Sequence, residues 1–563
     1  MPYFIILMAY ICKKIKLKNN MKKRVYLFSL LVISLFTFCT NNDDSNSGNE
    51  AKDNTIEINN DITSLSKRLD YTNSGVLSIT GSSAGKFSKS AESSTNSLPL
   101  VQIAEVNPPT DSNGRTLQAN HVAVNGNYAY VAYTMSGEVY SGAIDVIDVT
   151  DPYKPKLITS ALIANTDITS LTYSNGNLII GAATDIDKNT ALTSPSVLIT
   201  MQLSSGLLTD KYTITDLEGK VTTDVATNSN SYFATTGDQG SLFKINSATK
   251  AITAKATLED LRSVAISGDK IVTLSGTKGV NIYNESTLSL QKSFTTAADV
   301  SGAKRTMDFD GTKLLVSEGY NGLGVYDINS GSKLQTIALA TAGEDNVTNA
   351  VSVNEGYAFV ANGAAGLNVY KTGSQLNLLG TVNIVGSSNY VKSSGDFIYV
   401  ASGKGGLKII KMEKPNAIFA GCTDYGSYNQ GQNLILNSNE IKSYSGSTAI
   451  SSAMINSGAI LTHCGSITVQ NGLTLNSGGT FNMRGTFAQG KYQQQNPTEL
   501  IINSNAILQI EGTVVIWGDL RLNSGAKINF IGNDSSITIY GKVTKNSNVT
   551  ITGTYKDTES KLK

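Results

Sequence analysis

Nucleophilic and metal-binding side chains are scarce in this 563-residue sequence, which holds two histidines and four cysteines. Cys422 and Cys464 lie in the same C-terminal region, and His463 directly precedes the second of them. In an oxidising compartment the two thiols could pair as a disulfide, or they could remain free and buried. Because two thiols and one imidazole are an incomplete zinc set, the sequence predicts no metal site here.

The other motifs that suggest ligand chemistry lack its full pattern. Asp308 and Asp310 stand in Met307-Asp-Phe-Asp-Gly, as at the start of a cation-binding loop, but the acidic spacing does not continue. We interpret this segment as a turn. The glycine-rich segment Gly403-Lys-Gly-Gly lacks the GxxxxGK[ST] frame of a phosphate loop. We therefore expect no bound cofactor.

His121 begins a strand-like segment, where it could line a channel or serve as a satisfied packing residue. Neither His121 nor His463 has a visible carboxylate partner, so the sequence predicts no catalytic triad and no catalytic residue. A loop at residues 489–497 combines an aromatic ring with side-chain amides, a composition suited to contact with a sugar or a protein, although exposed loops commonly look like this. Its candidate binding residues are Tyr492, Gln493, Gln494, Gln495 and Asn496.

The charge balance limits the class of partner. Lys and Arg number 45 against 44 Asp and Glu, the formal net charge is +1, and only 16% of the residues are charged. A chain without a basic surplus gains little from releasing counterions on a phosphate backbone. The composition therefore argues against nucleic acid as the partner.

Repeated strand units must position these residues between 98 and 413. A strand, a glycine turn, a second strand, a GxxG turn and a third strand recur at intervals of roughly 40 to 45 residues, which is typical of propeller blades. Two earlier units, led by His121 and Leu171, bring the total to seven blades. The GxxG pairs are Gly237 and Gly240, Gly276 and Gly279, Gly319 and Gly322, Gly363 and Gly366, and Gly403 and Gly406.

The seventh unit lacks an outer strand after residue 412. Residues 100–106, Leu-Val-Gln-Ile-Ala-Glu-Val, stand before the first unit and have the length of the missing strand. We predict that they pair into the seventh blade and close the ring, because this protects an otherwise open sheet edge.

The first unit resembles a known family through Gly142-Ala-Ile-Asp-Val-Ile-Asp-Val-Thr-Asp-Pro-Tyr-Lys-Pro. This segment is similar to the LVIVD repeat, a bacterial surface propeller unit whose strand typically ends in Asp-Val-Ser-x-Pro. Later units keep the GxxG pattern, as in Gly322-Leu-Gly-Val-Tyr-Asp, but lose the Asp-Pro end. The resemblance implies a β-propeller at the cell surface and no common catalytic motif.

A second repeat fills residues 414–563. Asn-Ser pairs recur about every twenty residues between short β-prone runs, and such pairs suit tight corners because their side chains bond nearby backbone. We predict a short β-helix, or β-solenoid, of six rungs in which asparagines of successive rungs stack. The fold class is therefore all-β, a seven-bladed propeller followed by a solenoid. The corner asparagines are Asn437, Asn456, Asn476, Asn503, Asn523 and Asn546.

The N-terminal region reads as an address. Met21 is followed by three basic residues, an apolar run at residues 25–38 and then Cys39, a run too short to span a bilayer comfortably. The segment resembles a lipoprotein signal of Bacteroidetes type, which implies lipidation of Cys39 and an outer-membrane or cell-surface location. Phe38 departs from the small residue preferred there, which leaves an ordinary cleaved signal or an uncleaved anchor open. We assign residues 1–39 to an upstream segment and this signal, and residues 40–97 to a disordered tether.

Two classes of function remain, with a third behind them. The favoured one is a noncatalytic surface lipoprotein that binds or adheres to a glycan or protein partner. The alternative is a polysaccharide lyase or hydrolase, since propellers and β-helices both serve as enzyme scaffolds; no repeat visibly breaks its pattern to supply clustered carboxylates, lysines or tyrosines, so we lean against enzymatic activity. The third is a structural or secretion-accessory role in the outer membrane.

Overall fold

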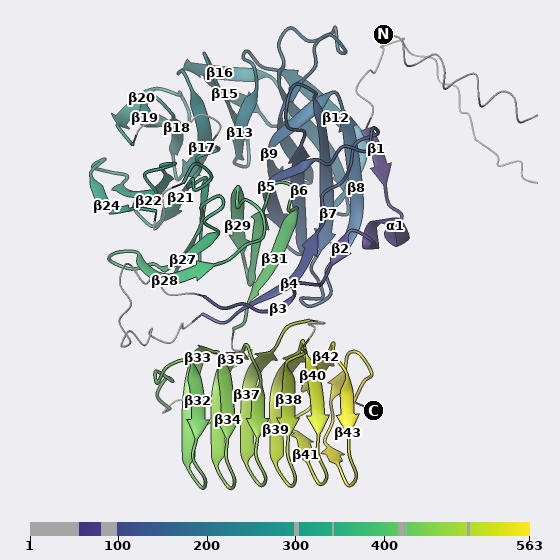
Figure 1. Cartoon of the computed structure of the whole chain (residues 1–563). Coiled ribbons are helices and arrows are strands. Elements are labelled where there is room, and N and C mark those ends of the chain that lie inside the picture. Colours follow the sequence, from purple (N-terminus) through teal and green to yellow (C-terminus); the bar gives the residue numbers. More distant parts are fainter. Residues whose placement is uncertain are drawn as a thin grey trace, which may run out of the picture. The chain divides into compact units, whose positions relative to one another are not determined.

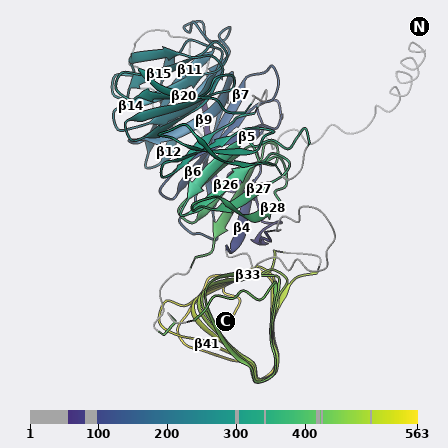
Figure 2. The same ribbon diagram turned by 90° about the vertical axis from the view of Figure 1, so that its left-hand side faces the viewer.

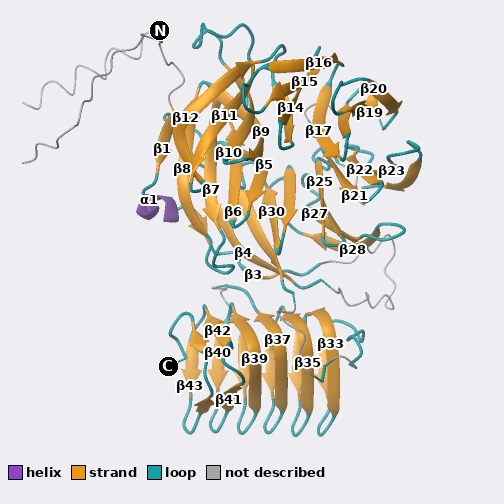
Figure 3. Cartoon of the chain, turned by 180° about the vertical axis from the view of Figure 1, so that it is seen from behind, coloured by secondary structure: helices purple, strands orange, loops and turns teal. Residues whose placement is uncertain are grey.

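Seven antiparallel sheets form a ring between residues 98 and 414 in the computed structural model of the chain (Figure 1). The structure describes residues 56–79, 98–297, 303–339, 343–414, 421–422, 425–492 and 496–562. These residues belong to one compact unit that spans Lys52–Lys563. The described residues are almost entirely strand and loop, with one short helix, α1 (Ile62–Ser66) (Figure 3). The predicted all-β propeller is confirmed.

Each blade has four strands that follow the chain from the channel outwards. Blades one to four comprise β5 (Gln118–Asn125), β6 (Tyr128–Thr134), β7 (Ser141–Asp148) and β8 (Lys156–Ala164); β9 (Thr166–Ser174), β10 (Asn177–Thr184), β11 (Ser196–Ser204) and β12 (Leu207–Asp216); β13 (Thr222–Thr227), β14 (Ser231–Thr236), β15 (Ser241–Asn246) and β16 (Ile252–Thr257); and β17 (Leu261–Ser267), β18 (Lys270–Ser275), β19 (Gly279–Asn284) and β20 (Leu290–Phe294). Blades five to seven comprise β21 (Met307–Asp310), β22 (Lys313–Ser317), β23 (Leu323–Asp327) and β24 (Lys333–Ile337); β25 (Ala350–Asn354), β26 (Tyr357–Ala361), β27 (Leu367–Lys371) and β28 (Asn377–Val382); and β29 (Tyr390–Ser394), β30 (Phe397–Ala401), β31 (Leu407–Met412) and β4 (Leu100–Val106).

The predicted ring closure is confirmed by the pairing of β4 with β31. The two strands are antiparallel, with Leu407 opposite Val106 and Met412 opposite Leu100. The second glycine of the preceding GxxG turn, Gly406, has φ +73°, and a Cβ built on it would lie 2.1 Å from the carbonyl oxygen of Val106. A glycine is therefore required at this point for the closing strand to approach.

Separate hydrophobic clusters join each blade to the next. Strand side chains alternate between the two faces of a sheet, so a second strand can contribute to both of its neighbours. In β10, Leu178 and Ile180 pack towards blade one, whereas Ile179 packs with Val225 of blade three. Burial of apolar side chains between sheets thus holds the ring together.

Part of the expected tether is ordered, which corrects the prediction that all of residues 40–97 are disordered. β1 (Ile56–Asn59) pairs with β8 as a fifth strand of blade one, while β2 (Leu69–Asp70) and β3 (Gly75–Val76) pair with β4. The guanidinium of Arg68 forms a bidentate ion pair with the fully buried Asp145 of β7, at 3.0 and 2.5 Å. We call residues 56–79 the N-terminal strap; its order comes from long-range partners that local composition does not show.

The C-terminal domain is a solenoid of about six turns, as predicted, and Figure 2 views its coils nearly end on. It has two parallel sheets around a core that contains Phe481 and Phe487. One sheet comprises β32 (Asn433–Leu436), β34 (Ser452–Ile455), β36 (Leu473–Leu475), β38 (Glu499–Ile502), β40 (Asp519–Leu522) and β43 (Val543–Lys545). The other comprises β33 (Ile441–Ile450), β35 (Ile460–Val469), β37 (Thr480–Gln489), β39 (Ile507–Ile516), β41 (Lys527–Phe530), β42 (Ser536–Ile539), β44 (Thr550–Thr552) and β45 (Lys556–Asp557).

The predicted stacking of corner asparagines is confirmed. Asn476 Nδ2 donates to Asn456 Oδ1 at 2.8 Å, Asn503 to Asn476 at 3.2 Å, Asn523 to Asn503 at 2.7 Å and Asn546 to Asn523 at 3.0 Å. Each interior amide donates to one neighbouring rung and accepts from the other. The resulting ladder sets the register between coils.

Candidate functional site

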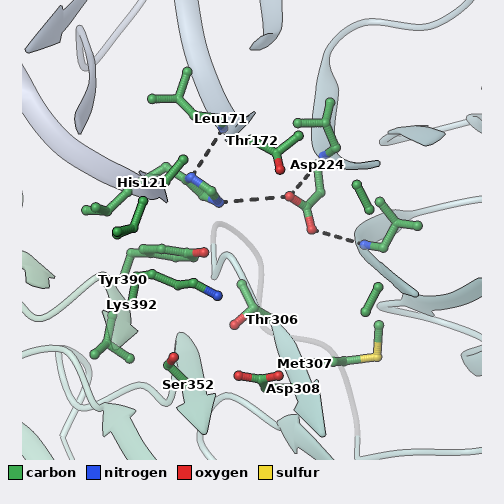
Figure 4. A pocket seen from close by; sticks show the side chains of 18 of the residues that line it. His121, Leu171, Thr172, Asp224, Thr306, Met307, Asp308, Ser352, Tyr390 and Lys392 are labelled. Atoms are coloured by element: carbon green, nitrogen blue, oxygen red, sulfur yellow. Dashed lines mark hydrogen bonds and ion pairs between the residues drawn. The ribbon is translucent and has the colours of Figure 1, made fainter. Parts of the chain in front are cut away.

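The inner strands of the seven blades, β5, β9, β13, β17, β21, β25 and β29, enclose a central channel with a cavity of about 390 Å³ (Figure 4). The cavity is larger than side-chain packing leaves in a core, and it falls in the size range of small-ligand sites. Polar and ionisable groups from separate blades meet in it. Its lining includes His121, Thr172, Asp224, Thr306, Asp308, Ser352, Tyr390 and Lys392.

The imidazole of His121 is held between two blades. Its Nδ1 accepts a hydrogen bond from the backbone N–H of Leu171 at 3.2 Å, so the neutral ring carries its proton on Nε2. The ring lies against that of Tyr390, with centroids 4.0 Å apart. Burial lowers the pKa of His121 well below its ordinary value, and the charges of Lys304 and Lys392 lower it further. The imidazole is therefore neutral at physiological pH.

The carboxylate of Asp224 accepts three hydrogen bonds from the scaffold. Oδ2 accepts from the backbone N–H of Val264 at 3.0 Å, and Oδ1 accepts from Val225 N at 3.0 Å and from the Ser170 hydroxyl at 2.6 Å. Burial raises the pKa of Asp224, whereas Lys304 and these donors oppose the rise. The side chain bridges blades two, three and four.

The same device recurs in the later blades. Asp308 Oδ2 accepts from the backbone N–H of Val353 at 2.7 Å, and Ser352 Oγ accepts from that of Ser393 at 3.0 Å. Burial raises the pKa of Asp308, and Lys392 lowers it. Asp308 thus faces the channel from β21, which the interpretation of its motif as a turn did not include.

Exposed strand edges explain this pattern. The innermost strand of a blade has a neighbour on one side only, so its other edge presents unpaired backbone groups. Bulged residues satisfy some carbonyls: Asn120 Nδ2 donates to Ile168 O at 2.6 Å, and Thr223 Oγ1 donates to Leu261 O at 2.9 Å. The channel wall is therefore bonded from blade to blade.

Two lysines and a tyrosine supply donors to the channel. The ammonium of Lys304 donates to the carbonyl oxygen of Thr169, and burial lowers its pKa to about 8 although Asp224 acts in the opposite direction. The ammonium of Lys392 is directed into the cavity (Figure 4) and makes no hydrogen bond or ion pair with any described residue. The Tyr390 hydroxyl likewise has no hydrogen-bond partner in the described part of the chain, and burial raises its pKa.

Ser170, His121 and Asp224 have the composition of a nucleophilic triad but not its geometry. Ser170 donates to the carboxylate at 2.6 Å, while its Oγ lies 3.4 Å from His121 Nε2. A base for serine needs an unprotonated nitrogen that faces the hydroxyl, with the carboxylate on the opposite nitrogen. Here the facing nitrogen carries the proton and the opposite nitrogen accepts from Leu171, so His121 cannot remove the serine proton.

The C-terminal cysteines are joined. The structure bonds Cys422 and Cys464 in a disulfide with Cα atoms 5.9 Å apart, near Arg484. His463 lies inside the solenoid, where its Nε2 is 3.0 Å from Thr448 Oγ1, and burial lowers its pKa to about 4. No group of three or more His, Cys, Asp or Glu residues suited to a metal occurs in the described ranges.

The predicted binding loop is placed only in part. Tyr492 is half-buried, and its ring lies 6.1 Å from that of Tyr71 and 5.9 Å from that of Tyr540. Asn496 is exposed, while Gln493, Gln494 and Gln495 lie outside the described residues, as does Cys39. Among the helices described, none is long and apolar enough to cross a membrane.

Sequence reasoning placed His121 on an inner strand but missed Asp224, Lys304, Tyr390 and Lys392. The expectation that no repeat breaks its pattern to supply such groups is wrong, since several inner strands each contribute one or two. Because these residues are far apart in the sequence, no local spacing connects them. The available signal was a charged residue beside a buried apolar one in an inner strand, as in Asp224-Val225.

Three stretches of the chain match the LVIVD repeat family, residues 118–162, 347–369 and 385–411, which lie in blades one, six and seven. No curated protein matches the chain. Among solved structures, the chain is similar to that of U3-55K, with 14% identity over 53% of this chain and 96% of that chain and a TM-score of 0.42. It is also similar to the WD40 β-propeller domain of Doa1, with 10% identity over 57% of this chain and 97% of that chain and a TM-score of 0.40.

Proposed function

We propose that the protein is a noncatalytic, surface-anchored binding protein and that the propeller channel receives its ligand, a glycan or part of a surface protein. The observation that carries this proposal is the division of labour in the channel. His121, Asp224 and Asp308 are occupied in bonding backbone groups of neighbouring blades. Lys392 and the Tyr390 hydroxyl have no such partner among the described residues, which leaves them free to recognise a ligand.

A blocked channel tests this proposal. Thr172 lines the cavity, so Thr172→Trp should fill it, whereas Thr253→Trp places the same ring on the exposed outer strand β16. Residues 52–563 of each variant are screened against glycan and surface-protein panels, with circular dichroism and melting as checks of folding. Loss of binding in Thr172→Trp alone supports the channel, while equal binding by both folded variants contradicts it.

Anchoring is a separate element of the proposal, supported by the basic segment, apolar run and cysteine at residues 22–39. Lipidation of Cys39 would leave the polar residues after it as a link to the N-terminal strap. Expression of the full chain with a labelled fatty acid should label the wild type and leave Cys39→Ser unlabelled. A labelled Cys39→Ser variant, or an unlabelled wild type, contradicts a lipid on this thiol.

The alternative of a polysaccharide lyase or hydrolase is supported by one observation. The channel brings two carboxylates, Asp224 and Asp308, together with the imidazole of His121, the phenol of Tyr390 and the amine of Lys392. Such groups serve acid, base and charge-stabilising roles in polysaccharide cleavage. Release of reducing ends or unsaturated products from a polysaccharide panel, lost in Thr172→Trp, would favour this alternative.

A further inference from the structure

We infer that the channel selects a saccharide that carries an acidic group, with Lys392 as the residue that recognises the acid. This inference rests on the proposed function and names the chemical class of its ligand. It begins from the hydrogen-bonding capacity left over in the cavity once the scaffold's own bonds are counted. An ammonium has three donors, and none of those of Lys392 is taken by a described residue.

The two carboxylates do not neutralise Lys392 directly. Its Nζ forms no ion pair within 4.0 Å with Asp224, Asp308 or any other described carboxylate. Asp224 already accepts three hydrogen bonds out of about four lone-pair sites, one of them from the hydroxyl of Ser170. An incoming anionic oxygen is therefore the complementary partner for Lys392, and a charge-assisted bond is the strongest contact the cavity offers it.

Asp308 supplies the complementary feature for hydroxyl groups. It accepts from Val353 N and Phe309 N, which leaves about two of its lone-pair sites open towards the cavity. Neutral hydroxyl donors suit these sites, and the Tyr390 hydroxyl can donate to a ring or hydroxyl oxygen. Because the Tyr390 ring is supported by His121 at 4.0 Å, this donor is held in place.

A cationic ligand fits less well. It would meet Lys392 and Lys304, while His121 stays neutral and offers no negative charge. An acidic peptide satisfies Lys392 but brings few hydroxyl donors for Asp308. The combination of one acidic group with several hydroxyl groups is the chemistry of an acidic sugar.

The test compares galacturonic acid oligomers with carboxyl-reduced oligomers of the same length, by titration calorimetry on residues 52–563. The acid form should bind about tenfold or more tightly than the reduced form, in line with a charged hydrogen bond. Lys392→Met should abolish this preference. Lys211→Met, which removes an exposed lysine of β12, should preserve it.

A second variant moves the preference in the opposite direction. Asp308→Asn keeps an oxygen for Val353 N–H but removes a negative charge from the channel, so the ratio of acid to neutral affinity should rise. Equal affinity for both oligomers, unchanged in Lys392→Met, overturns this inference and leaves the proposed binding function standing. Tighter binding of an acidic peptide such as oligoglutamate overturns the assignment to a saccharide. A failure of the wider panels to detect any channel-dependent ligand instead overturns the proposed function itself.

Discussion

His121 of blade one accepts a hydrogen bond through Nδ1 from the backbone N–H of Leu171 in blade two, at 3.2 Å. The contact joins a side chain that lines the channel to the unpaired edge of the next sheet. Asp224, Asp308 and Ser352 make equivalent contacts further around the ring. Polar residues at the centre of this propeller therefore maintain the geometry between blades, and only part of their capacity is left for a ligand.

Removal of the Asp224 carboxylate should destabilise the propeller. Asp224→Ala leaves the N–H of Val264 and the hydroxyl of Ser170 buried without their acceptor, at a cost of about 2–4 kcal/mol. Asp224→Asn keeps one acceptor oxygen and should lose less. Urea unfolding followed by circular dichroism measures both, with the exposed Asp238→Ala as control. Equal stability of Asp224→Ala and Asp238→Ala would contradict the bridging role.

The solenoid should lose stability as the pH falls, through His463. Burial holds its pKa at about 4 against an ordinary value of 6.5, so the unfolded chain binds a proton that the folded chain excludes. This contribution is complete above pH 6.5 and is lost progressively as the pH falls towards 4, by up to about 3 kcal/mol.

The comparison that isolates this effect is wild type against His463→Met, chosen because Met483 occupies the paired position on the next rung. Urea unfolding at pH 7 and at pH 4.5 should show a smaller loss of stability on acidification in the variant. His121 is unchanged in both chains, so its own contribution cancels. Identical pH dependence of the two chains would show that His463 is protonated in the folded state.

The N-terminal strap should open when Arg68 is replaced. Arg68→Ala leaves the fully buried Asp145 without its partner, which costs about 3 kcal/mol. Hydrogen exchange should then accelerate at the amides of β1 and β2 while the blade interiors stay protected. The double variant Arg68→Met with Asp145→Leu should recover most of the protection. Unchanged exchange in Arg68→Ala would mean that strand pairing alone holds the strap.

The asparagine ladder should be more sensitive in its middle than at its end. Asn503 both accepts from Asn523 and donates to Asn476, whereas Asn546 is exposed and donates once. We expect Asn503→Ala to cost about 1–3 kcal/mol and Asn546→Ala less than about 1 kcal/mol. Thermal unfolding of the two variants provides the comparison, and equal losses would indicate that the ladder contributes little to stability.

The disulfide should stabilise the start of the solenoid by shortening the free chain in the unfolded state. For a separation of 42 residues, the chain-entropy relation gives about 4 kcal/mol. Reductant should therefore lower the melting temperature of the wild type and leave the Cys422→Ser, Cys464→Ser double variant unaffected. A reductant-insensitive wild type would contradict a bonded pair in solution.

Much of the fold could be predicted because repetition repeats its own signal. The GxxG spacing identified the blades, and the missing outer strand after residue 412 indicated that residues 100–106 close the ring. The corner asparagines indicated the solenoid turns. In each case one local pattern recurs often enough to outweigh irregular units.

The strap and the channel could not be predicted, for a shared physical reason. Arg68 is ordered by Asp145, which lies far along the sequence, and its own neighbours resemble a linker. Asp224, Tyr390 and Lys392 come together only when the ring has closed. Single residues from distant repeats have no mutual spacing that a sequence pattern can reveal.

The pairing of β4 with β31 also sets a schedule for biogenesis. About 300 residues separate the two strands, and a ribosome adds about 5–20 residues per second, so roughly 15–60 s elapse between synthesis of the first partner and of the second. During that interval the growing chain carries an unpaired strand edge that is prone to aggregation. The nascent protein therefore depends on whatever shields that edge during its manufacture, and its last blade cannot mature until translation has passed residue 412.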